Sequence, residues 1–163
     1  MEGCSDPEPG TYLNVSYEAL SAVRGLPWKQ HVSLQRVRQG AVPTRTVCIV
    51  DDDESIRQAL RGLLKSAGFQ SELFASAEEF LESGRLAETA CLVLDVRMAR
   101  MTGLEMQEQL LASGWNIPII FITAHGEEDA RTRALERGAI DFLQKPFSDQ
   151  ALLNAIGRAI GSA

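Results

Sequence analysis

The chain has 163 residues, which is enough for one domain and an additional segment. Its apolar fraction of 45% and charged fraction of 23% are typical of a globular protein. The net charge of −6 is uneven, because residues 46–163 carry 11 Lys and Arg against 18 Asp and Glu, whereas residues 1–45 carry five against four. The acidic main part lacks the basic footprint of a nucleic-acid-binding surface, so no direct contact with nucleic acid is expected.

The chain shows no sign of export or of membrane insertion. No apolar run approaches the ~20 residues that a membrane-spanning helix needs. The amino terminus carries three acids within its first eight residues and no apolar core, unlike a secretory signal. The three cysteines do not make an even disulfide set, and Cys48 and Cys91 lie within apolar runs. A cytoplasmic location is therefore expected.

Residues 1–45 differ in pattern from the rest of the chain. Their prolines, glycines and thinly spaced apolar residues predict a flexible N-terminal extension. An alternative is a segment that binds a partner. The residues available for such binding are Tyr12, Tyr17, Trp28, Arg36 and Arg38.

From Thr46 onward, apolar strand-like runs alternate five times with helical patterns. The strands are predicted at about 47–50, 69–74, 90–94, 119–122 and 139–143. The helices are predicted at about 56–67, after Ser76, at 103–113, from Glu127 and after Ser148. A capping box of Ser76 and Glu79 should begin the second helix, Ser148 should cap the fifth, and Gly68 and Gly138 should end the first and fourth.

This alternation predicts the fold class. Continuously apolar strands indicate burial on both faces of a parallel sheet, and the intervening helices provide right-handed crossovers. Five such units in residues 46–162 predict one three-layer, doubly wound α/β domain. In sheets of this kind, ligands bind beyond the carboxyl ends of the strands.

Polar residues stand at four of these carboxyl ends. Asp51 and Asp52 follow the first strand, Asp95 the third, Thr123 the fourth and Lys145 the fifth. Carboxylates, a hydroxyl and an ammonium at one edge of a sheet are the groups of a metal-assisted phosphoryl site. Mg²⁺ suits them, because it prefers oxygen ligands and shares them with phosphate.

Each of these groups has an expected role. Asp95 stands alone at the end of a central strand and is the predicted nucleophile, while the adjacent acids would hold the metal. Thr123 and Lys145 would bind phosphoryl oxygens. Close carboxylates without metal repel one another, so at least one pKa should be raised. Asp53 and Glu54, by contrast, are interpreted as the cap and dipole partner of the first helix.

At these residues the chain resembles the receiver domain of two-component response regulators. Several segments match the pattern of that family: Val50-Asp51-Asp52, Leu94 to Met98, Met101-Thr102-Gly103, Ile122-Thr123-Ala124 and Lys145-Pro146-Phe147. The longer segments Ile122 to Gly126 and Ala139 to Phe147 are most similar to the FixJ-type subgroup. The resemblance covers Thr46 to about Ser162 and implies a flavodoxin-like (βα)5 sheet with strand order 2-1-3-4-5.

The resemblance implies specific roles. Asp95 would accept a phosphoryl group from a sensor histidine kinase, and Mg²⁺ would bind Asp52, Asp95 and the backbone carbonyl of Arg97, with Asp51 acting mainly through water. Phe142 would be the switch aromatic that packs inward when Thr123 engages phosphate. Such a protein is not an enzyme in the usual sense, because it catalyses only its own phosphoryl uptake and loss. It would signal through its fourth helix, fifth strand and fifth helix to a downstream protein partner or output domain.

Two departures from the family pattern stand out. Ala99 follows Met98 where the family commonly has proline, which removes a fixed φ from the loop after Asp95. The FixJ-type helix-turn-helix output domain does not follow before Ala163, so the expectation is a stand-alone regulator or a receiver cut from a longer one. Whether phosphorylation drives homodimerisation is left open.

Two other functions stay open at this point. One is an interaction module that retains the site without using phosphorylation. The other is an aspartyl-phosphate hydrolase, because Asp51 and Asp53 have the two-residue spacing of the acids in those enzymes.

Overall fold

The computed structural model describes residues 46–124 and 127–161. The segment 1–45 and His125 and Gly126 of the quoted motif lie outside this range. The strands are β1 (Thr46–Val50), β2 (Gln70–Phe74), β3 (Thr89–Asp95), β4 (Ile119–Thr123) and β5 (Asp141–Gln144). The helices are α1 (Glu54–Ser66), α2 (Ala77–Glu82), the 3-10 turn η4 (Leu86–Glu88), α3 (Gly103–Ala112), α4 (Glu128–Glu136) and α5 (Asp149–Gly161).

The five strands form one parallel sheet in the order β2-β1-β3-β4-β5, which confirms the expected fold. The register aligns Val50 of β1 with Leu94 of β3, and Asp95 with Ile122 of β4. Because every strand runs in the same direction, all the carboxyl ends meet at one edge of the sheet and all the amino ends at the other.

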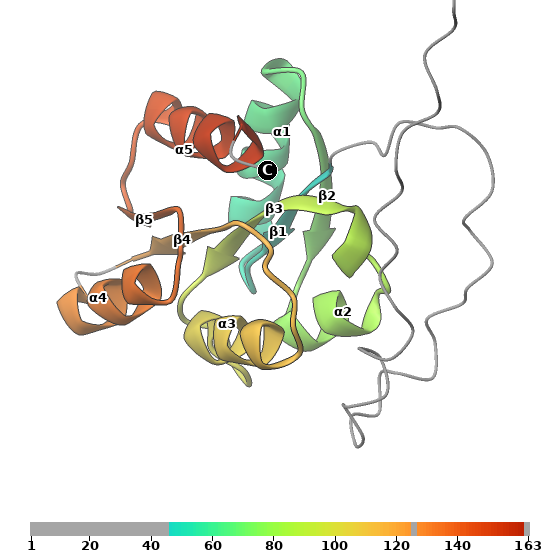
Figure 1. The fold of residues 1–163 in the computed structure, drawn as a ribbon. Helices are drawn as coiled ribbons and strands as arrows, with labels where there is room; N and C mark the ends of the chain where they lie inside the picture. The colour runs from blue at the N-terminus through green and yellow to red at the C-terminus, as the bar shows by residue number, and fades with distance from the viewer. Residues whose placement is uncertain (1–45, 125–126, 162–163) are drawn as a thin grey trace, which may run out of the picture.

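Helices cover both faces of the sheet (Figure 1). Val47 and Ile49 of β1 pack with α1 and α5 on one face, while Cys48 and Val50 pack with the helices α2, α3 and α4 on the other. Both faces are buried because β1, β3 and β4 are apolar at nearly every position. The sheet is therefore a rigid support for the loops at its carboxyl edge.

The predicted helix ends are largely confirmed. Asp53 caps α1 by accepting N–H bonds from Ser55 and Ile56, and Ser148 Oγ accepts the N–H of Ala151. Gly68 and Gly138 follow α1 and α4 with φ of 84° and 88°, a region that favours glycine.

Two local predictions were wrong in detail. The capping box of α2 is half formed, because Glu79 N–H donates to Ser76 Oγ while the Glu79 carboxylate accepts the N–H of Ala75 instead of that of Ser76. The fifth strand begins at Asp141 instead of 139, because the N–H of Ala139 is bonded to the carbonyl of Ala134 and so completes the end of α4.

The sequence interpretation missed a complete capping box at the start of α3. Glu105 N–H donates to Thr102 Oγ1, and the Glu105 carboxylate accepts the N–H of Thr102 at 2.8 Å. We expect Thr102→Ala to lower the free energy of unfolding by about 1 kcal/mol, measured by urea denaturation. Thr132→Ala, on the exposed side of α4, is the control and should change stability far less. Equal losses in both variants would contradict the role of the cap.

The described residues include no helix that is both long enough and apolar enough to cross a bilayer.

Candidate phosphoryl site

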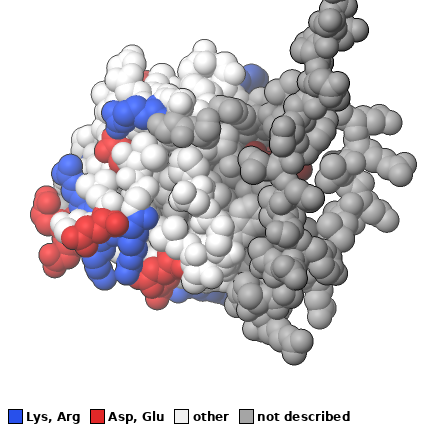
Figure 2. All heavy atoms as spheres, in the orientation of Figure 1, with Lys and Arg blue, Asp and Glu red and all other residues white. Residues whose placement is uncertain are grey.

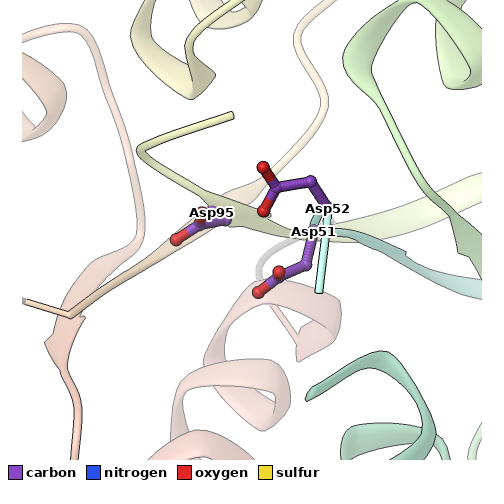
Figure 3. A group of neighbouring side chains, drawn as sticks. All are labelled: Asp51, Asp52 and Asp95. Atoms are coloured by element: carbon purple, nitrogen blue, oxygen red, sulfur yellow. The ribbon is translucent and has the colours of Figure 1, made fainter. Parts of the chain in front are cut away.

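Three carboxylates converge at the carboxyl edge of the sheet (Figure 3). Asp51 and Asp52 follow β1, and Asp95 ends the neighbouring strand β3. One oxygen from each carboxylate lies within 4.8 Å of the others. Asp51 and Asp95 are buried, whereas Asp52 is exposed. Oxygen ligands at this separation fit a hard divalent cation, as the sequence predicted.

Lys145 brings a positive charge to the same place from β5. Its Nζ donates to Asp51 Oδ2 at 3.2 Å and lies 3.8 Å from Asp95 Oδ1. The backbone N–H of Lys145 also donates to the carbonyl of Thr123 at 2.7 Å, so the ends of β4 and β5 are bonded together. Thr123 is buried at the end of β4, and the Lys145–Pro146 peptide bond is cis. The structure thus brings together four of the five side chains that the sequence placed at strand ends, those of Asp51, Asp52, Asp95 and Lys145, and bonds the backbone of Thr123 to that of Lys145.

The pKa of Asp95 is raised to about 6. Burial is the largest cause, followed by the charge of Asp51, and the ammonium of Lys145 opposes both. At pH 7 the carboxyl group of Asp95 is mostly ionised, but its buried negative charge destabilises the folded state. A bound cation that neutralises this charge would relieve that destabilisation.

This pKa predicts a pH-dependent stability without metal. The folded state retains a proton on Asp95 up to about pH 6, whereas the unfolded chain loses it near pH 4, so this residue destabilises the fold progressively as the pH rises from 4 to 6. In the presence of a chelator, we expect Asp95→Asn to be more stable than the wild type by about 2 kcal/mol at pH 7 and by little at pH 4. Urea denaturation at both pH values measures this difference, and a gain independent of pH would contradict it.

Asp53, the third aspartate after β1, is bonded to the start of α1. Asp53 accepts N–H bonds at the start of α1, and its carboxylate also accepts the hydroxyl of Ser55 at 2.5 Å, which lowers its pKa. Its own N–H donates to Asp51 Oδ1 at 2.8 Å, and Arg57 donates to the carbonyl of Asp51 at 2.6 Å. Asp53 therefore caps α1, as predicted, and its backbone N–H also helps to position Asp51, which the sequence did not predict.

The loop after Asp95 is held against the sheet by Gly103. The N–H of Gly103 donates to the carbonyl of Val96 at 3.0 Å, and a Cβ at this position would overlap the carbonyl oxygen of Asp95. The same Cβ would lie 3.1 Å from core atoms of both Leu94 and Phe121. Only glycine allows this close approach. The sequence interpretation did not assign this role, although Gly103 stood within a quoted motif.

Arg97, two residues after Asp95, points its side chain toward the β4–α4 loop. Its Nε forms an ion pair with Glu127, the residue that precedes α4. Charged side chains gather over α4 at the left of Figure 2. Sequence reasoning missed this pair, because 30 positions separate its members and both look like ordinary loop residues. Ala99, at the family's proline position, lies exposed in the same loop.

Phe142 lies inward on β5. It is buried, and its ring centroid is 5.9 Å from that of Phe121 on β4. The resemblance assigns Phe142 the role of a switch aromatic, and that role stays a prediction. Phe142 is paired in register with Phe121 of β4, the strand that ends in Thr123.

Comparison with known families decides the class of this protein. The sequence model described as "Response regulator receiver domain" matches residues 47–157, which is more than half of the chain. The chain belongs to the response regulator receiver family. This family is a signalling module of two-component systems and not a class of conventional enzymes.

Curated relatives of this receiver include named regulators. Nodulation protein W of Bradyrhizobium diazoefficiens is 47% identical over 110 residues, which are 68% of this chain and 48% of that protein. The transcriptional regulatory protein FixJ of Rhizobium meliloti is 41% identical over 114 residues, 70% of this chain and 56% of that protein. The chain thus spans about half the length of the curated relatives it matches. The FixJ-like interpretation is confirmed.

Solved structures support the same fold for the receiver. The response regulator StyR has a TM-score of 0.69 at 53% identity, covering 73% of this chain and 60% of that one. The structure described as FixJ-N has a TM-score of 0.67 at 38% identity, covering 77% of this chain and 98% of that one.

Proposed function

We propose that this receiver is a phosphoacceptor in a two-component phosphorelay, modified on Asp95 by a sensor histidine kinase in the cytoplasm. The observation that carries the proposal is the position of Asp95, a largely buried carboxylate with a pKa of about 6 that lies 3.8 Å from the ammonium of Lys145. A carboxylate that is ionised at pH 7 and faces a cation is prepared to attack an electrophile.

The proposed transfer moves one phosphoryl group. A carboxylate oxygen of Asp95 bonds to phosphorus as the bond from phosphorus to the imidazole nitrogen of the kinase breaks, and the nitrogen leaves with the electron pair. Lys145 would bind one phosphoryl oxygen, and the hydroxyl of Thr123 would bind another. Their positions at the ends of β5 and β4, beside Asp95, support these roles.

Asp51, Asp52, Asp95 and the carbonyl of Arg97 are the proposed holders of Mg²⁺. The donor set fits, because three carboxylate oxygens lie within 4.8 Å of one another, and burial together with the charge of Asp51 raises the pKa of Asp95. When bound, Mg²⁺ would neutralise charge shared by the carboxylates and the phosphoryl oxygens. Asp51, already bonded to Asp53 N–H and Lys145, would act mainly through water.

The output of this receiver would pass through the face formed by α4, β5 and α5. Thr123 precedes the α4 loop directly, and Phe142 on β5 packs beside the strand that ends in Thr123. Movement of Thr123 toward phosphate would therefore reach both elements. The proposed receptor of this change is a protein partner or an output domain, with homodimerisation as one form that it could take.

The proposal is tested by incubating the protein with a small acyl phosphate, with Mg²⁺ and with a chelator. We expect the mass of one added phosphoryl group with Mg²⁺ and little or none with the chelator. Mg²⁺ binding is measured separately by titration calorimetry. Absence of both metal binding and phosphoryl uptake would favour the alternative, a phosphorylation-independent interaction module with an inherited site.

A further inference from the structure

A concave surface lies at the amino edge of the sheet, where the strands begin, opposite the edge that carries the phosphoryl site. It is a groove of about 340 Å³ between η4, the start of β3, the segment before β4 and the last turn of α5. Apolar side chains dominate it, including Trp115, Pro118 and Ile160, each of which is only partly buried. Glu88 is its one charged member among the described residues, so the groove suits an aromatic or aliphatic side chain.

We propose that this groove binds the amino-terminal segment of the same chain, with Trp28 as the anchor. This surface is distinct from the phosphoryl site, and the inference does not depend on the proposed function. The occupant is assigned by three observations: where the segment joins the domain, how far Trp28 can reach, and what the segment contains.

The segment joins the domain beside the groove. Residues 1–45 lead into Thr46, the first residue of β1, and Thr46 is paired in register with Thr89. Thr89 itself lines the groove. Neighbouring strands lie about 4.8 Å apart, so the junction is one strand spacing from the groove wall.

Trp28 precedes Thr46 by 18 positions. An unfolded chain of that length would span roughly 25 Å, which is enough to fold back onto the groove. Because the anchor is attached to the domain, binding is intramolecular and the effective concentration is of millimolar order. A contact too weak to form between separate molecules can therefore be well populated within one chain.

The composition of the segment complements the domain. Trp28 is the largest apolar side chain in residues 1–45, and the stretch from Ala19 to Arg45 carries five cations and no acid. The domain that follows carries an excess of seven acids, and Glu88 stands on the groove wall. Opposite net charges favour the approach of the segment, and the apolar groove provides the specific contact. The groove between α3 and α4 is less suitable, because seven of its eleven lining residues are charged.

The test uses the full chain, labelled with ¹⁵N and ¹³C, because its two tryptophans give two separate indole N–H signals in NMR spectra. We expect nuclear Overhauser contacts between the Trp28 ring and Pro118 or Ile160, and a shift of the Trp115 indole signal in Trp28→Ala. Tyr17→Ala, another aromatic substitution in the segment, should leave Trp115 unchanged. On the domain side, Ala87→Glu places a charge in the groove at an exposed position and should abolish these contacts. Ala112→Glu, an exposed alanine at the end of α3, should not.

Other outcomes would overturn the inference. A Trp28 indole signal at its random-coil position, with no contact to the groove, would show that the segment does not bind. Contacts between Trp28 and another surface would assign a different site. Contacts that fade on dilution would indicate binding to a second copy of the chain.

Discussion

Asp95→Asn is expected to lose phosphoryl uptake from a small acyl phosphate by at least ~10³-fold, since the variant lacks the attacking oxygen anion. The fold should survive, because the amide has nearly the shape of the carboxylate and removes the charge whose burial raises its pKa to about 6. Intact-mass measurement over a time course in Mg²⁺ gives the rate. The product in the wild type should be an acyl phosphate, which hydroxylamine cleaves.

Asp53→Asn is the matched control for this experiment. Asp53 lies two positions from Asp51, but its carboxylate is engaged with Ser55 at the start of α1. Asparagine caps helices about as well as aspartate, so stability and phosphoryl uptake should both stay close to those of the wild type. Equal labelling of Asp95→Asn and the wild type would refute Asp95 as the acceptor, whereas loss in both variants would indicate damage to the loop.

Gly103→Ala is expected to destabilise the domain by about 3 kcal/mol, at the upper end of overpacking effects. The added methyl group would press against the carbonyl oxygen of Asp95 and against two residues of the core, Leu94 and Phe121, which are fully buried. None of these atoms is the end of a flexible exposed side chain, so the loop or α3 must move. Because the obstructed atom belongs to Asp95, phosphoryl uptake should also slow.

Gly62→Ala provides the comparison for that variant. Gly62 lies within α1, and a Cβ there would have no neighbour within 4 Å. Alanine should therefore stabilise the helix by about 0.5–1 kcal/mol. Urea denaturation should show a lower free energy of unfolding for Gly103→Ala and a higher one for Gly62→Ala. A destabilisation of similar size at both positions would mean that the close approach at Gly103 is not the cause.

The sequence predicted the sheet well because its core strands are apolar at almost every position. β3 and β4 end on the candidate site residues Asp95 and Thr123, and Asp51 follows β1 directly, so strand limits and candidate ligands could be found together. The strand order came from the resemblance, since alternation alone does not specify which strands are neighbours. β5 was placed less accurately, because its first predicted residues take part in the end of α4.

Contacts between distant residues could not be predicted in the same way. Lys145 was assigned to phosphoryl oxygens, yet it also pairs with Asp51, 94 positions away. The pair of Arg97 and Glu127 depends on how two loops face each other. The close approach of Gly103 depends on the packing of α3 against β3. These features arise from tertiary structure, and a pattern of neighbouring residues in the sequence does not reveal them. The capping box of Thr102 and Glu105, in contrast, had a local signature that was overlooked.

Because the strands are parallel, the acidic site and the start of β1 lie at opposite edges of the sheet. The acidic residues lie where the strands end, and the chain enters at Thr46, where they begin, ~15 Å away along β1. A fluorescent protein or an affinity tag fused ahead of Thr46 would therefore emerge on the side remote from Asp95. Such a fusion should leave the carboxyl edge of the sheet free for the proposed phosphoryl donor, which makes this end the suitable attachment point for testing the proposed phosphorylation in living cells.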